Sequence, residues 1–213
     1  MRIDFFFDPG CPWCWITSRW ITEVQPHRDL DVHWRTFSLF EKNRDTMPAE
    51  YLDRVRAGHG ALRVAEAVRA SDGESAVADF YTEYAARIHH DKVRANDIDI
   101  ADVLQAVALP PGAAESANDD TWDTIIKQSM DEALVLAGND VGVPLISFDG
   151  AVAYFGPVMT PAPQGDDALK LWDALATLTT IGGFYELKNS ARPKPELHDR
   201  PQPHRTPTSG RAG

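Results

Sequence analysis

Short apolar runs frame a helical pattern in the first forty residues of the chain. Residues 2–7 form a short, aromatic and β-prone run, which predicts a buried first strand. After the turn sequence Asp-Pro-Gly, apolar residues recur every four positions at Ile16, Trp20 and Val24, which predicts a helix with one buried face. Residues 30–40 alternate between apolar and polar, as expected of a second strand.

Helical periodicity then dominates residues 44–139, where several amphipathic segments follow one another. Within them His59 stands between two glycines in RAGHG, and we expect it in a loop. β character returns in VPLISFDGAVAYFG, where Asp149-Gly150 is a strong signal for a hairpin turn. A last amphipathic helix is predicted over residues 165–178.

The order of these elements predicts the fold class. Without the helical block, β-α-β followed by β-β-α remains, which is the α/β arrangement of the thioredoxin fold. We therefore expect a thioredoxin-like domain made of residues 1–43 and 140–189, with a large α-helical insertion, residues 44–139, that acts as a lid between the two halves. Residues 190–213 are polar and proline-rich, and we expect a disordered tail there.

Charge and composition exclude some partners. The 213 residues carry a net charge of −11, and no basic stripe interrupts the acidic body, which argues against nucleic acid and anionic membranes. The sequence shows neither an apolar run long enough for a bilayer nor a signal peptide, so we expect a cytoplasmic protein. The two cysteines of such a protein are expected to be catalytic, redox-sensing or metal-binding.

Both cysteines lie in FDPGCPWCWITSRW, three residues apart at the start of the first predicted helix. Pro12 suits the first helical turn. Cys11 should meet the unpaired N–H groups and the dipole of the helix start, which favour a thiolate, while Cys14 lies one turn deeper. We expect Cys11 to attack a disulfide or another electrophile and Cys14 to resolve the mixed species, leaving a redox-active Cys11–Cys14 disulfide.

Two other interpretations of this pair fit the sequence less well. Half of a zinc site would need further ligands, but the chain has no second cysteine pair, so we expect no metal. Two inert buried thiols would have no reason to flank a proline at a helix start.

Other residues are expected beside the dithiol. Trp13 offers a flat apolar face for covering a thiol or stacking a planar substrate, and half-buried packing is an equally good explanation. The Val143-Pro144 bond fits a cis proline that faces the dithiol and leaves the backbone of Val143 available to a substrate, the alternative being a trans turn proline.

The second strand should end beside the dithiol, because a helix connects it to the first strand and the two therefore run parallel. Asn43, Arg44 and Tyr51 then become candidates for binding a polar thiol cofactor, although each also fits ordinary loop or cap chemistry. Asp8 is a candidate proton shuttle, and capping of its own turn is the simpler interpretation.

The segments FDPGCPWCWITSRW, NRD, VGVPLISFDGAVAYFGPV, LWDALATL and FYELK together carry a resemblance. They are similar to the DsbA-family thioredoxin-fold oxidoreductases of the FrnE-like branch, and more narrowly to the mycothiol-dependent nitroreductases. The resemblance implies a CPWC dithiol that reduces disulfides or nitroaromatic compounds, with mycothiol as co-substrate and no tightly bound cofactor. It also implies Cys11 as nucleophile, Cys14 as resolver, Pro144 as the cis proline, and Trp13 and Tyr51 near the substrate, and it makes a homodimer reasonable.

Two alternative functions remain open at this point. Kappa-class glutathione transferases and hydroxychromene carboxylate isomerases share this fold but lack a dithiol, so a thiol-dependent transferase or isomerase would not require Cys14. A non-enzymatic redox switch with chaperone-like activity would protect other proteins without turnover.

Overall fold

The computed structural model describes residues 1–203, except for the side chains of residues 49, 51, 53 and 54. The chain divides into two compact units. The first unit is made of three segments, Met1–Phe7, Cys11–Arg35 and Asp131–Asp199. The second is made of Asp8–Gly10, Thr36–Met130 and the chain from Arg200. The predicted boundaries of the lid and of the tail stay predictions, and residues 204–213 of that tail lie outside the described residues.

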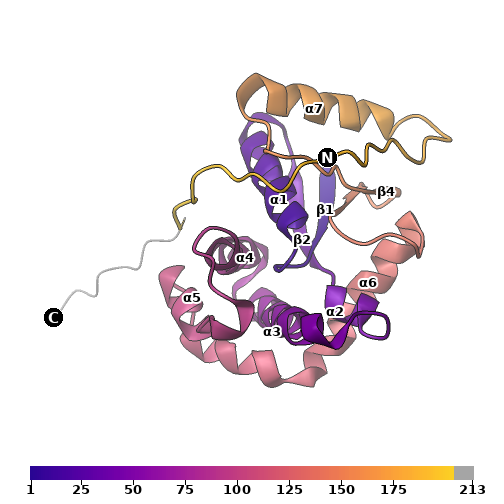
Figure 1. Cartoon of the computed structure of the whole chain (residues 1–213). Helices are drawn as coiled ribbons and strands as arrows, with labels where there is room; N and C mark the ends of the chain where they lie inside the picture. Colours follow the sequence, from indigo (N-terminus) through magenta and orange to yellow (C-terminus); the bar gives the residue numbers. More distant parts are fainter. Residues whose placement is uncertain (204–213) are drawn as a thin grey trace. The chain divides into compact units, whose positions relative to one another are not determined.

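A four-stranded sheet in the order β2-β1-β3-β4 forms the centre of the first unit (Figure 1). Its strands are β1 (Arg2–Phe7), β2 (Asp31–Thr36), β3 (Leu145–Phe148) and β4 (Val152–Phe155). The N–H of Asp31 donates to the carbonyl of Met1 at 2.9 Å, so β1 and β2 begin at the same edge and run in parallel. Strand β3 is antiparallel to both β1 and β4.

Two helices complete the two halves of this fold, α1 (Pro12–Val24) after β1 and α7 (Gly165–Leu178) after β4. The short 3-10 helix η1 (Gln25–His27) leads from α1 to β2. The observed β-α-β and β-β-α halves, separated by a long helical segment, confirm the predicted thioredoxin fold with a large α-helical insertion.

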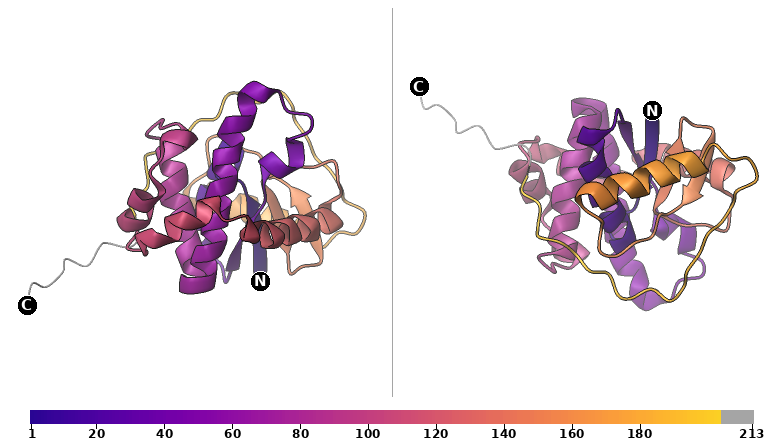
Figure 2. Two further views of the ribbon diagram at one scale, coloured as in Figure 1. Left: turned by 90° about the horizontal axis from the view of Figure 1, so that it is seen from below. Right: turned by 90° about the horizontal axis from the view of Figure 1, so that it is seen from above.

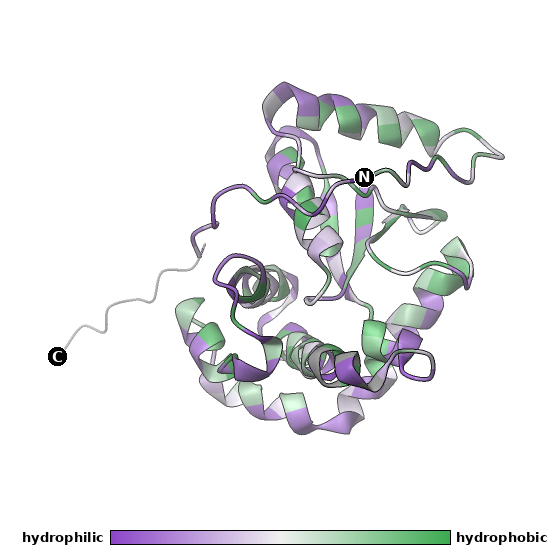
Figure 3. Ribbon diagram, in the orientation of Figure 1, coloured by the Kyte–Doolittle hydropathy of each residue, from purple (hydrophilic) through white to green (hydrophobic). Residues whose placement is uncertain are grey.

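Tryptophans connect α1 and α7 to the sheet. The ring of Trp172 lies 6.0 Å from that of Phe148 and 5.5 Å from that of Trp20, measured between centroids. The indole N–H of Trp20 also donates to the carbonyl of Ala168 at 3.0 Å. Hydrophobic and hydrophilic stretches alternate along α7 (Figure 3), as expected of a helix with one face on a core. These contacts fix α1, which has Cys11 as its N-cap and Cys14 in its first turn.

The turn between β3 and β4 is the predicted hairpin turn. Asp149 and Gly150 have φ angles of 49° and 67°, and two consecutive positive φ values match the right-handed twist of the flanking strands. The carboxylate of Asp149 accepts the N–H of Arg2 at 2.8 Å, which ties the turn to the start of β1.

Helices make up the second unit, as predicted for the insertion. In chain order they are α2 (Leu39–Asn43), α3 (Ala49–Asp72), α4 (Glu74–His89), η2 (Ala95–Asp97), α5 (Ile100–Ala106), η3 (Pro111–Asn118), η4 (Asp120–Trp122) and α6 (Asp123–Ala137), the last of which ends in the first unit. None of the helices in the described chain combines the length and apolar content of a membrane span.

The expectation that His59 lies in a loop is wrong, because α3 is continuous through RAGHG. A Cβ on Gly60 would lie 3.3 Å from the carbonyl oxygen of Ala117, tighter than most such contacts. Glycine here therefore permits the close approach of η3 rather than breaking the helix. His59 is buried, with an exposed fraction of 3%.

Candidate active site

The dithiol lies at the start of α1, where the turn after β1 ends. Cys11 is the N-cap residue, with extended backbone angles, and Pro12 is the first residue of the helix. The N–H of Cys14 donates to the sulfur of Cys11 at 3.4 Å, and the N–H of Trp15 donates to its carbonyl at 3.1 Å. The sulfur of Cys11 thus meets an N–H group of the helix start, as the sequence predicted.

A second backbone segment reaches the same sulfur. The Val143–Pro144 peptide bond is cis, as predicted, and the carbonyl oxygen of Val143 lies 3.7 Å from the Cys11 sulfur as acceptor of a weak S–H bond. The carbonyl of Pro144 accepts the N–H of Gly156 at 2.8 Å, which connects this segment to the end of β4. The first unit therefore brings the CPWC motif and Val143-Pro144 together.

The two thiols differ in exposure. Both are free, and the exposed fraction is 6% for Cys11 and 0% for Cys14. Cysteines three apart on a helix are close enough to be bridged with small backbone adjustments. The arrangement suits attack on an electrophile by Cys11. The more enclosed Cys14 can then attack the Cys11 sulfur and displace the bound group.

Trp13, between the two cysteines, has an unexpected neighbour from the C-terminal part of the chain. The guanidinium carbon of Arg192 lies 5.0 Å from the centroid of its ring, which is within the range of cation–π interactions. Trp13 is half-buried and Arg192 is exposed. No sequence signal pointed to Arg192, because it stands in a polar, proline-rich segment without periodicity.

Asn43, Arg44 and Tyr51 belong to the second unit. The side-chain amide of Asn43 donates to the carbonyl of Leu39 at 3.0 Å, and Arg44 forms an exposed ion pair with Glu41 at 3.2 Å. Tyr51 is a residue of α3, but its side chain lies outside the described part of the structure. Their expected proximity to the dithiol stays a prediction.

Asp8, three residues before Cys11, caps its own turn, as the simpler interpretation expected. Its carboxylate accepts the N–H of Gly10 at 2.8 Å and that of Leu39 at 2.9 Å. Burial raises the pKa of Asp8 to about 6, although the two backbone N–H groups oppose the shift. Burial also raises the pKa of Tyr84, and the charge of Asp8 adds to that effect.

Asp8 gives stability a defined pH dependence. Because its folded pKa of about 6 lies above the ordinary value of 3.8, the folded protein holds this proton more tightly than the unfolded chain does. The contribution of Asp8 to stability is therefore fully present below the unfolded pKa and is lost as the pH rises through the folded pKa, on the order of 3 kcal/mol in total.

Urea unfolding of the wild type and of Asp8→Asn measures this contribution. The free energy of unfolding of the wild type, relative to that of the variant, is expected to fall between about pH 4 and about pH 6.5 and to level off above that. If the difference in the free energy of unfolding between wild type and variant stayed constant or rose over this interval, the pKa of Asp8 would not be raised in the folded protein.

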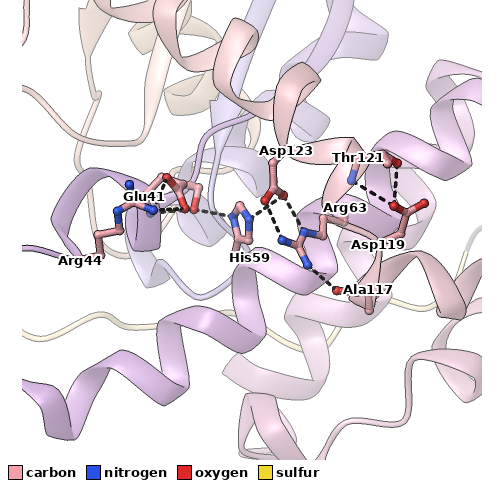
Figure 4. Close-up of polar contacts among 9 residues, drawn as sticks. Glu41, Arg44, His59, Arg63, Ala117, Asp119, Thr121 and Asp123 are labelled. Carbon is pink, nitrogen blue, oxygen red and sulfur yellow. Dashed lines mark hydrogen bonds and ion pairs between the residues drawn. The ribbon is translucent and has the colours of Figure 1, made fainter.

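A chain of polar contacts in the second unit has the residue types of a hydrolase triad. His59 Nδ1 lies 2.9 Å from Ser38 Oγ and its Nε2 lies 2.9 Å from Asp123 Oδ1, while the guanidinium of Arg63 donates to both oxygens of Asp123 and to the carbonyl of Ala117 (Figure 4). Burial lowers the pKa of His59, although the charge of Asp123 opposes the shift.

Ser38, however, is not placed to act as a nucleophile. Its side chain is fully buried, and its oxygen caps α2 by accepting the N–H of Glu41 at 3.1 Å. We therefore assign this chain of contacts to the packing of α2, α3 and α6. Among the described residues, no group of three or more His, Cys, Asp or Glu side chains is placed to hold a metal ion.

The strand order, the cysteine pair at the start of α1 and the cis proline beside Cys11 define the class of thioredoxin-fold oxidoreductases. The particular family follows from a match over residues 10–189 to the family model described as Rv2466c-like, mycothiol-dependent nitroreductase Rv2466c. The chain belongs to this family, which confirms the resemblance drawn from the motifs.

The chain is also similar to other known proteins and structures. The uncharacterized protein Rv2286c of Mycobacterium tuberculosis is 29% identical over 195 residues, which cover 90% of this chain and 83% of the relative. The cytosolic disulfide reductase DsbM from Pseudomonas aeruginosa superposes with a TM-score of 0.56 at 16% identity, over 84% of this chain and 100% of that one. A probable DsbA oxidoreductase from Streptomyces coelicolor gives 0.54 at 18% identity, over 89% and 94%. At these identities the two structures support the fold.

Proposed function

We propose that the protein is a thiol-disulfide oxidoreductase whose Cys11 and Cys14 alternate between a dithiol and a disulfide. The observation that supports this most is the position of the Cys11 sulfur, which caps α1, accepts the N–H of Cys14 and lies beside the carbonyl of Val143. A thiolate stabilised at a helix start is the attacking species of disulfide exchange.

The proposed reduction of a disulfide takes two steps. The Cys11 thiolate attacks one sulfur of RSSR, so that a Cys11–SR bond forms and RS⁻ leaves and takes up a proton. Cys14 then loses its proton and attacks the sulfur of Cys11, which releases the second RS⁻. The protein has lost two electrons, and RSSR has become two RSH.

Mycothiol is the proposed recycling thiol, because the description of the family names it. One mycothiol attacks the Cys11–Cys14 disulfide and forms a mixed disulfide with the protein. A second mycothiol attacks the sulfur of the bound mycothiol and displaces the protein thiolate, which takes up a proton, so the products are the protein dithiol and mycothiol disulfide. With a nitroaromatic substrate, the two electrons and two protons of the dithiol would convert the nitro group to a nitroso group and water.

The other site residues have supporting roles in this proposal. Pro12 starts the helix, Trp13 covers the thiol and lies near the substrate, and the backbone of Val143 before Pro144 pairs with the bound thiol or disulfide. Recycling of the disulfide by a low-molecular-weight thiol needs a reducing compartment, so we propose that the protein works in the cytoplasm.

Asn43, Arg44 and Tyr51 are proposed to contact the polar part of the thiol from the second unit. Arg44 and the amide of Asn43 offer N–H donors suited to the hydroxyl groups of a sugar-bearing thiol such as mycothiol. We also propose that the protein forms a homodimer, on the ground of the family resemblance. The lid function of the insertion is proposed from the predicted topology.

Turnover with different reductants tests the proposal. Reduction of a nitroaromatic compound and of bis(2-hydroxyethyl) disulfide would be followed with mycothiol, glutathione or thioredoxin as the sole reductant. We expect repeated turnover with mycothiol and rates at least about tenfold lower with glutathione, because the two thiols offer different groups to the site. The proposal would be contradicted if thioredoxin supported turnover and mycothiol did not. It would also be contradicted if the protein consumed no more than one disulfide per molecule with every reductant.

A further inference from the structure

The chain after α7 is fixed to the first unit at two places. Tyr154 on β4 donates its hydroxyl to the carbonyl of Phe184 at 3.0 Å, and their rings lie 5.8 Å apart. Farther along, the N–H of Glu196 donates to Thr160 Oγ1 at 2.6 Å, and His198 Nε2 donates to the carbonyl of Ala162 at 2.6 Å. Residues 184–198, here called the C-terminal strap, run between these anchors without helix or strand (Figure 2).

Arg192 lies between the two anchors, and its guanidinium is placed over Trp13 of the CPWC motif. The anchors restrict where this part of the strap can go, so the contact does not depend on the cation–π attraction alone. A positive charge is thereby placed over the residue that separates the two cysteines, within the same compact unit.

Arg192 differs from two other arginines of the first unit in its ion pairs. Arg28, also in the first unit, pairs with Asp173 at 2.7 Å, and Arg35 pairs with Glu132. Among the carboxylates that the structure describes, none forms an ion pair with Arg192, and the side chain is exposed. A guanidinium that stacks on an indole keeps its N–H donors at its edge, where they can form two parallel hydrogen bonds with a carboxylate.

We propose that Arg192 is a specificity residue of the active site and binds the carboxylate of a small anionic disulfide during its reaction with Cys11. This inference rests on the proposed function and adds the chemical class of the substrate. On a chain with a net charge of −11, the guanidinium over Trp13 offers an anionic substrate a local attraction beside the CPWC motif. The redox step is the exchange given above, with RSSR carrying a carboxylate on each half.

The test compares two small disulfides that differ in charge, 3,3′-dithiodipropionate and bis(2-hydroxyethyl) disulfide. Reduced protein is mixed with each disulfide, quenched in acid and assayed by mass spectrometry for oxidation of Cys11 and Cys14, so no recycling thiol is needed. In Arg192→Gln, the rate with the anionic disulfide is expected to fall about tenfold, while the rate with the neutral one changes less than about twofold. Added salt should reduce the difference between the wild-type and Arg192→Gln rates with the anionic disulfide.

Lys194→Gln is the matched control, since it removes one exposed positive charge from the same strap. It is expected to leave the ratio of the two rates unchanged. An unchanged ratio in Arg192→Gln, or an equal loss with both disulfides, would overturn the specificity role while leaving the proposed function intact. If neither disulfide oxidised the wild-type protein, the proposed function itself would fail.

Discussion

Replacing Cys11 by serine is expected to lower the rate of disulfide reduction at least about 10³-fold, because the attacking atom is lost. A serine hydroxyl remains protonated at neutral pH and does not attack a disulfide sulfur at a useful rate. The rate would be measured with bis(2-hydroxyethyl) disulfide and an excess of reductant, after subtraction of the uncatalysed reaction.

The size of the effect separates chemistry from folding. Serine is nearly isosteric with cysteine, and the N–H of Cys14 can still bond to an oxygen at the cap position. Cys11→Ser should therefore unfold within about 1 kcal/mol of the wild type. A variant that folds and keeps more than about a tenth of wild-type activity would remove Cys11 from the role of nucleophile.

Replacing Cys14 by serine is expected to stop the reaction at the mixed disulfide. The Cys11 thiolate still attacks RSSR, but no second protein thiol is available to displace RS⁻ from Cys11. With no recycling thiol present, intact-mass spectrometry should show one RS group per protein, on Cys11, where the wild type shows the Cys11–Cys14 disulfide.

The same variant distinguishes the proposed reductase from a transferase or isomerase of this fold. Those activities need one thiol at most, so they would survive the loss of Cys14. Full multiple-turnover activity of Cys14→Ser, with no trapped adduct, would favour a transferase or isomerase and contradict the reductase cycle.

Local signals were sufficient to predict the fold. The β-prone run at residues 2–7, the helical spacing of Ile16, Trp20 and Val24, and the Asp149-Gly150 turn each determine a local structure without help from the rest of the chain. The position of Cys11 as N-cap could also be predicted, because a proline directly after it fits only the first helical turn.

Other features depend on contacts between residues far apart in sequence, and the sequence did not reveal them. His59 looked like a loop residue because two glycines flank it, yet Gly60 serves the close packing of η3 against α3. Arg192 stands in a segment whose composition indicates disorder, and its position over Trp13 follows from the bonds of Phe184 and Glu196 to distant partners.

The most direct measurement concerns the disulfide between Cys11 and Cys14. Both cysteines fall in one tryptic peptide, residues 3–19, so the bond can be read from the mass of that peptide. After brief treatment with a small excess of bis(2-hydroxyethyl) disulfide and quenching in acid, this peptide should be two hydrogen atoms lighter and should regain them with dithiothreitol. Two thiols that remained free, or protein chains joined to one another through these cysteines, would contradict the dithiol mechanism.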